Sequence, residues 1–155
     1  MLDRAAIGRV LPPVTATVER GRLRFFLNAI GETSPIHHDT AAAQAAGYRD
    51  CPIPPTYLFC LRMLDAPEPY ALLDELGVDL GTVLHGEQSF TYHQPVVAGD
   101  EIRFIGRIAD IFDRKGGALE FLVEEIRVER VSDGAHVADV RQVTVIRNPV
   151  AGGAA

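Results

Sequence analysis

Four long β-rich segments follow one another in the second half of the chain, and they restrict the possible folds more than any other feature. They span residues 83–96, 101–112, 119–131 and 135–146, and the separators are AGD, DRKGGA and SDG. These separators are typical turn sequences. Because a parallel crossover needs a dozen or more residues, such short connections predict antiparallel pairing of consecutive strands.

The first half of the chain is predicted to contain a short strand and then a helix. Residues 14–18 are largely β-branched and follow Pro12 and Pro13, a position that suits an edge strand. Residues 23–30 place apolar side chains at helical spacing and stop at Gly31. This pattern predicts an amphipathic helix that ends at the glycine.

Two further helices are predicted before the strands begin. AAAQAA can form a short helix that is capped by Asp39 or Thr40 and ends at Gly47. The run TYLFCLRML, from Thr56, is apolar nearly all round, which is typical of a helix enclosed by protein. One short strand, these helices and a long antiparallel meander together predict an α+β fold, a strongly curved sheet wrapped around a buried helix.

Length and composition indicate one soluble domain. A chain of 155 residues suits a single domain, expected at residues 1–148, with residues 149–155 as a disordered tail. The beginning of the chain is too polar for a secretory signal, and no apolar run approaches the roughly 18 residues of a membrane span. We therefore expect a cytoplasmic protein without a membrane partner.

Charge and cysteine content exclude several classes of partner. The net charge is −6 and the 15 Lys and Arg residues are scattered, so no nucleic-acid surface is expected. Cys51 and Cys60 lie nine positions apart without a C-x-x-C motif, so neither a metal nor a cofactor is expected. Free thiols are the favoured interpretation, with a disulfide or a nucleophilic cysteine as the alternatives.

The nine residues GETSPIHHD, at 31–39, concentrate the groups that could carry chemistry. Their residue types alone fit a solvent-facing loop that ends a helix. Their order, however, resembles the hydratase motif G-D-x-N-P-(Ile/Leu/Val)-H-x5-(Ala/Ser), with Ala43 at the final position. Glu32 stands where the motif has Asp, and Ser34 stands where it has Asn.

Three further stretches extend this resemblance over residues 10–147. They are Gly47-Tyr48 with Pro54-Pro55-Thr56, then His85-Gly86-Glu87-Gln88, then Pro95 to Asp100. Together the four stretches are similar to the MaoC-like hydratase/dehydratase family, in particular to the N-terminal half of its two-domain members. The resemblance implies a hot-dog fold.

The resemblance also implies an activity and a set of site residues. The family adds water reversibly to the double bond of a trans-2-enoyl thioester of CoA or acyl carrier protein, giving an (R)-3-hydroxyacyl thioester. Glu32 and His37 occupy the positions of the catalytic pair. Substrate-binding residues are expected at Ser34, Pro55, Thr56 and Tyr57. Backbone N–H groups near Thr56 and Tyr57, at the start of the buried helix, could polarise the thioester oxygen.

Other polar residues are expected to have no catalytic role. His38 is expected to be an exposed turn residue, because neighbouring side chains in an extended turn point apart. His85, Gln88 and His93 are expected to be ordinary residues of a strand.

Two functional hypotheses remain open from the sequence. One is a homodimeric hydratase, since an open strand edge favours dimerisation. The other is a non-catalytic acyl-binding subunit that pairs with a catalytic hot-dog partner, favoured by Glu32 and Ser34. A hot-dog thioesterase comes third, because TYLFCLRML lacks the acidic residue that such enzymes carry on the buried helix.

Overall fold

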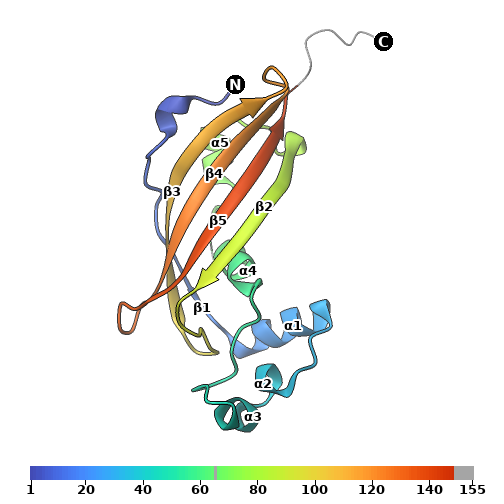
Figure 1. Ribbon diagram of the computed structural model, residues 1–155, viewed down its shortest axis with the longest axis vertical. Helices are drawn as coiled ribbons and strands as arrows, with labels where there is room; N and C mark the ends of the chain where they lie inside the picture. Colours follow the sequence, from blue (N-terminus) through green and yellow to red (C-terminus); the bar gives the residue numbers. More distant parts are fainter. Residues whose placement is uncertain (65, 149–155) are drawn as a thin grey trace.

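The computed structural model describes residues 1–64 and 66–148; residues 149–155, predicted above as a disordered tail, lie outside them. Within the described residues, five strands form one antiparallel sheet in the order β1-β3-β4-β5-β2 (Figure 1). The strands are β1 (Val14–Thr17), β2 (Val83–Tyr92), β3 (Glu101–Arg114), β4 (Leu119–Arg130) and β5 (His136–Arg147). The α-helices are α1 (Arg20–Ile30), α2 (Pro35–His38), α3 (Thr40–Ala45), α4 (Tyr57–Leu64) and α5 (Ala71–Glu75), and the 3-10 helices are η1 (Arg4–Ala6) and η2 (Leu80–Thr82).

Strand pairing confirms most of the predicted meander and corrects one part of it. β3, β4 and β5 pair as consecutive antiparallel neighbours, and β1 pairs with the outer edge of β3. β2, in contrast, pairs with β5 and not with β3. The strand stops at Tyr92 instead of Val96, so eight residues are available to carry the chain across to β3. Pro95 in this connection has no N–H to donate to a ladder, which explains why the strand ends early.

α4 lies against the concave face of the sheet (Figure 1), and its side chains correct the prediction of complete enclosure. Tyr57, Leu58 and Leu61 are buried, whereas Phe59 is half-buried and Leu64 is 58% exposed. A five-stranded sheet curls around one side of the helix only. The other side of α4 therefore remains an open apolar surface.

The core and one partly buried ion pair fix α4 in place. Its buried side chains join the main hydrophobic cluster, together with residues of α1 and of the strands. Arg62 reaches from α4 to the sheet and donates to Glu124 of β4 at 2.8 Å. None of the described helices is long and apolar enough to cross a membrane.

α1, α2 and α3 gather at one end of the sheet, below the first turn of α4 (Figure 1). As predicted, a helix reaches Ile30 and ends at Gly31, and Asp39 caps the next helix by accepting from Ala42 N–H at 2.7 Å. The region expected to be a plain turn contains the short helix α2 instead, with Pro35 at its first position. Proline is favoured there because the first helical N–H has no partner within the helix.

Gly86 on β2 provides a test of this packing. A Cβ at this position would lie 2.6 Å from Val145 Cγ2 and 3.0 Å from the Val143 carbonyl oxygen. We expect Gly86→Ala to lower the free energy of unfolding by about 1–3 kcal/mol, the usual cost of overpacking. Urea denaturation with a constant m-value would measure this loss. Gly21→Ala is the matched control, because nothing lies within 4 Å of a Cβ there and alanine favours the helix; equal midpoints for the two variants would contradict the prediction.

Candidate active site

The position of Glu32 is set by the way α1 ends. Gly31 adopts a left-handed conformation with φ 70°, which glycine tolerates best. Its N–H bonds the Asn28 carbonyl, and the N–H of Glu32 bonds the Leu27 carbonyl at 2.9 Å. These two bonds form a Schellman motif, which satisfies the last carbonyls of the helix and turns the chain sharply. Glu32 consequently follows the helix in a fixed direction.

The Glu32 carboxylate is held by the backbone of its own loop. Its Oε1 accepts the Ser34 N–H at 2.7 Å. This bond is the main cause that holds the pKa of Glu32 below its usual range. Burial opposes the shift, and the nearby His37 lowers the pKa further. Glu32 is therefore ionised near neutral pH and can only accept hydrogen bonds.

His37 is fixed by a carbonyl from a distant part of the chain. Its Nδ1 lies 2.7 Å from the carbonyl oxygen of Pro52. Because a carbonyl only accepts, Nδ1 must carry the hydrogen, and the Nε2 of neutral His37 then has a lone pair available. The ring can accept a proton at Nε2 without losing its orientation.

The Pro52 carbonyl is itself positioned by a short antiparallel bridge to Val97. Ile53 N–H bonds the Val96 carbonyl at 3.0 Å, and Ala98 N–H bonds the Cys51 carbonyl at 2.9 Å. Because backbone groups alternate in an extended segment, the carbonyl between these two bonds points the other way, toward His37. The sequence analysis did not identify Pro52, since no side-chain pattern marks a carbonyl acceptor.

The structure corrects the prediction for His38. This residue is half-buried, and its Nε2 donates to the backbone carbonyl of Glu32 at 2.7 Å. Both histidines belong to α2, where consecutive side chains point in different directions, so each bonds a different carbonyl. His38 fastens the backbone of the loop that carries Glu32.

The predicted substrate-binding residues are divided between surface and core. Pro55 and Thr56 are exposed at the start of α4, and Ser34 is half-buried at the start of α2. Tyr57, in contrast, is fully buried in the core and packs edge-on against Phe26, with ring centroids 5.0 Å apart. Its N–H bonds the Pro54 carbonyl at 3.0 Å. The Tyr57 N–H is therefore already engaged.

A cavity of about 400 Å³ adjoins this segment. Its lining includes Pro52, Pro55, Tyr92 and His93. The hydroxyl of Tyr92 donates to the Pro55 carbonyl at 2.8 Å. Burial raises the pKa of Tyr92, so this hydroxyl keeps its proton. The bond joins the end of β2 to the approach of α4.

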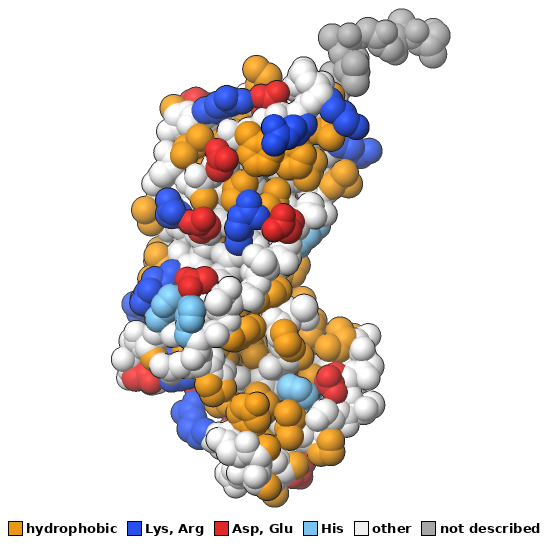
Figure 2. Space-filling model, in the orientation of Figure 1, with side chains coloured by type: hydrophobic (Ala, Val, Ile, Leu, Met, Phe, Trp, Pro, Cys, Tyr) orange, Lys and Arg blue, Asp and Glu red, His pale blue; other side chains and the backbone are white. Residues whose placement is uncertain are grey.

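The surface at this end of the molecule differs from the surface of the sheet. Figure 2 shows charged side chains of both signs over the sheet, whereas hydrophobic side chains surround one histidine and one acidic side chain at the end formed by α1–α3. A larger cavity of about 580 Å³ lies on the strands and is lined by charged residues such as Arg107, Glu125 and Arg141. The smaller cavity is thus the one that adjoins the Pro52 carbonyl bonded by His37.

The curved sheet, the helix on its concave face and the ordered motif after α1 define a MaoC-like hot-dog domain, as the sequence predicted. The chain belongs to the family described as FAS1-like, dehydratase domain region, whose model matches residues 5–140.

Comparison with individual proteins supports this assignment. An uncharacterised UPF0336 protein of Saccharopolyspora erythraea is 38% identical over 147 residues, which are 94% of this chain and 92% of the relative. The HadBC (3R-hydroxyacyl-ACP dehydratase) complex of Mycobacterium tuberculosis contains a chain with 25% identity and a TM-score of 0.74, over 90% of this chain and 96% of that one. The ChsH1-ChsH2 complex of the same organism contains a chain with 25% identity and a TM-score of 0.72, over 95% of this chain and 92% of that one. A MaoC-like dehydratase matches with a TM-score of 0.80 and 24% identity, over 93% of this chain and 43% of the other.

The bond from the Ser34 N–H to the Glu32 carboxylate can be tested by measuring the pKa of Glu32. Ser34 has φ −61°, so Ser34→Pro suits the local backbone while it removes this N–H. We expect the pKa of Glu32 to rise toward its ordinary value in this variant, and NMR titration of the side-chain carboxyl measures it. Ser34→Ala keeps the N–H and should leave the pKa unchanged. The same pKa in Ser34→Pro and the parent protein would contradict the assigned cause.

The sign of the linked stability follows from the direction of the shift. A carboxylate whose pKa is lowered on folding stabilises the native state above its unfolded pKa. This contribution is lost as pH falls through the lower folded pKa. Ser34→Pro should therefore also reduce the acid dependence of unfolding below about pH 4.5.

Proposed function

We propose that the protein catalyses the reversible hydration of trans-2-enoyl thioesters to (R)-3-hydroxyacyl thioesters, with CoA or acyl carrier protein as the carrier. Glu32 and His37 are the proposed catalytic pair. The observation that carries the proposal is the bond from His37 Nδ1 to the Pro52 carbonyl, because it leaves Nε2 as a proton acceptor. The relation to hydratases and dehydratases of known fold supports the reaction class.

In the hydration direction, the ionised Glu32 and His37 Nε2 hold one water molecule between them. The water oxygen bonds to C3 of the enoyl group as Nε2 takes one of the water protons. The C2–C3 double bond becomes a single bond, and its electron pair moves toward the thioester as enolate character. The proton on Nε2 is then delivered to C2, which restores neutral His37 and balances the addition.

The thioester is proposed to lie beside the start of α4, next to the cavity lined by Pro55 and Tyr92. Thr56 remains the proposed contact for the thioester oxygen, since the Tyr57 N–H is occupied by the Pro54 carbonyl. Ser34 is proposed to contribute its backbone N–H indirectly, by orienting Glu32. A donor aimed at the developing enolate typically accelerates such reactions by about 100-fold or more.

A second candidate is an acyl-binding subunit that works with a catalytic hot-dog partner. Three observations favour it. The Glu32 carboxylate turns back onto its own loop, and matched structures include the HadBC and ChsH1-ChsH2 complexes. The open side of α4, with Phe59 half-buried and Leu64 exposed, offers an apolar surface for such a partner.

The first candidate predicts activity in the purified chain. With crotonyl-CoA, the loss of enoyl absorbance should be slowed about 100-fold or more by His37→Ala, because the proton acceptor is lost. His38→Ala is the matched control and should cost less than about tenfold, since it loosens the loop without removing the base. A larger loss for His38→Ala than for His37→Ala would contradict the assigned roles. Glu32→Asp adds information, because a large gain in rate would mean that the longer side chain limits the native site.

The second candidate predicts a different pattern. The purified chain alone should be inert toward short and long enoyl-CoA substrates, and a second hot-dog protein should purify with it. Within that complex, His37→Ala in this chain should leave the rate unchanged, because the partner supplies the reacting groups. Activity of the isolated chain that depends on His37 would exclude this alternative.

A further inference from the structure

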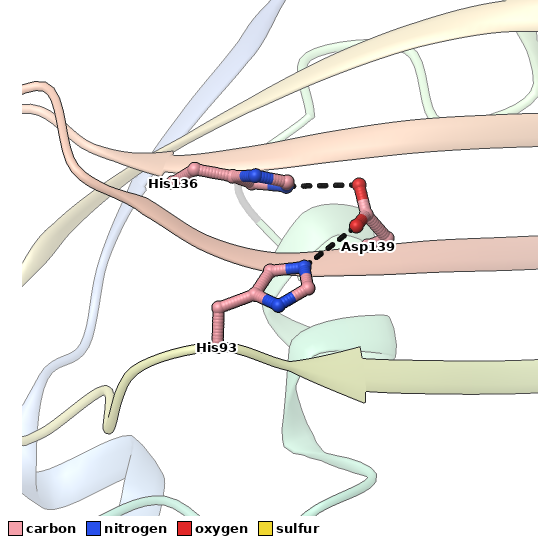
Figure 3. A group of neighbouring side chains, drawn as sticks. All are labelled: His93, His136 and Asp139. Carbon is pink, nitrogen blue, oxygen red and sulfur yellow. Dashed lines mark hydrogen bonds and ion pairs between the residues drawn. The ribbon is translucent and has the colours of Figure 1, made fainter.

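His93, His136 and Asp139 meet on the surface of the sheet (Figure 3). His93 follows the end of β2, whereas His136 and Asp139 belong to β5. The Nε2 of His93 lies 2.7 Å from Asp139 Oδ2, and the Nε2 of His136 lies 2.9 Å from Oδ1. His93 was predicted to be an ordinary strand residue, but it lies just beyond the end of β2 and joins this cluster.

We propose that these three side chains bind a divalent transition-metal ion of the zinc type. One ligand atom from each residue lies within 4.8 Å of the other two. Tetrahedral coordination at about 2.0–2.1 Å needs ligand atoms about 3.3 Å apart. Side-chain rotations that move the ligand atoms by about an ångström would bring them to coordination distance around an ion. All three side chains are at least partly exposed, so these rotations meet little resistance.

The ligand types select the class of metal. Two imidazoles and one carboxylate suit zinc, and also iron, nickel or copper, whereas magnesium and calcium prefer oxygen ligands alone. Both rings present Nε2 to the same carboxylate, and their centroids lie 4.4 Å apart. Three protein ligands would leave one tetrahedral position for water or another ligand.

The local electrostatics are compatible with a cation. Burial would raise the pKa of Asp139, but the bonds from His93 and His136 outweigh it and hold the pKa below its usual range. The carboxylate is therefore charged at neutral pH. Arg127 lies opposite Asp139 in the sheet, but its guanidinium donates to the Glu129 carboxylate at 2.7 Å. Glu129 therefore partly neutralises the positive charge of Arg127.

A metal here would join two segments that are far apart in sequence. It would attach the connection after β2 to β5, and His93 also lines the cavity beside Pro52 and Pro55. Metal binding would consequently stabilise one wall of that cavity. This site does not depend on the hydratase proposal, because none of its three residues is assigned a role in the reaction.

Calorimetric titration of the untagged protein with Zn²⁺ tests the proposal. We expect one equivalent to bind with a dissociation constant in the micromolar range. His136→Gln and Asp139→Asn should each weaken binding at least about tenfold, since each removes a ligand. A hundredfold excess of Zn²⁺ over the dissociation constant should raise the melting temperature by roughly 5 °C in the parent protein and by much less in the variants.

His85→Gln is the matched control, because His85 packs against Phe59 on another part of the surface. It should bind Zn²⁺ as the parent protein does. Circular dichroism of each variant before titration separates lost binding from lost folding, and having two ligand variants provides a second test if one unfolds. Unchanged affinity in a folded His136→Gln or Asp139→Asn variant would overturn the proposal, as would the absence of binding to the parent protein.

Discussion

The end of the molecule that carries the candidate active site is organised around the buried carboxylate of Asp100. This side chain is only 2% exposed and accepts the Val97 N–H at 2.9 Å. Arg49 pairs with its other oxygen, and Arg130 lies 3.5 Å away. A buried charge is tolerated only when it is paired and hydrogen-bonded, so these partners must assemble together.

This arrangement extends by backbone bonds to the proposed catalytic residue His37. Val97 forms the bridge with Pro52, and the Pro52 carbonyl orients His37. Removing the Asp100 carboxylate would take away the ion-pair partner of Arg49 and one of the partners of Arg130, which also pairs with Asp133. It would also loosen the segment that holds Pro52. The geometry of His37 therefore depends on a residue that has no chemical part in the proposed reaction.

Curvature is the second constraint on the structure. A sheet that curves strongly enough to cover Tyr57, Leu58 and Leu61 still leaves the opposite side of α4 uncovered. β2 lies at the edge of the described sheet, and its His85 packs against the half-buried Phe59 of α4. The open apolar side of α4 and the unpaired edge of β2 thus form one continuous region. A partner that covered one would also reach the other.

Local chemistry made much of the fold predictable. Turn sequences located three of the long strands, and Gly31 and Asp39 marked the end of one helix and the start of the next. The pairing of β2 was not predictable in this way, because the sequence AGD resembles a hairpin turn. Its early end depends on Pro95 and on the bonds of His93 and Gln94 to the Val137 carbonyl, which are contacts of the folded chain.

The candidate site was predictable where side chains form a pattern and not where backbone groups act. The order of GETSPIHHD drew attention to Glu32 and His37. Nothing in that order indicated that Pro52 would supply a carbonyl or that His38 would bond the Glu32 backbone. The enclosure of α4 was overestimated for a related reason, since an apolar sequence does not distinguish a surface buried within one chain from a surface covered by a partner.

For the proposed reaction, the direction of the free lone pairs on the Glu32 carboxylate matters more than their number. A carboxylate has about four positions for accepting hydrogen bonds, and the backbone N–H of Ser34 uses one of them. Enough capacity remains for a water molecule. In a turn, an aspartate at position 32 would readily accept the Ser34 N–H with its shorter side chain. Glu32 keeps this bond, but its extra methylene moves the remaining lone pairs of the carboxylate by about a bond length. Because displacements of about 1 Å can cost about 100-fold in rate, the direction of those lone pairs relative to His37 Nε2 decides between a working hydratase and a subunit that only binds the acyl chain.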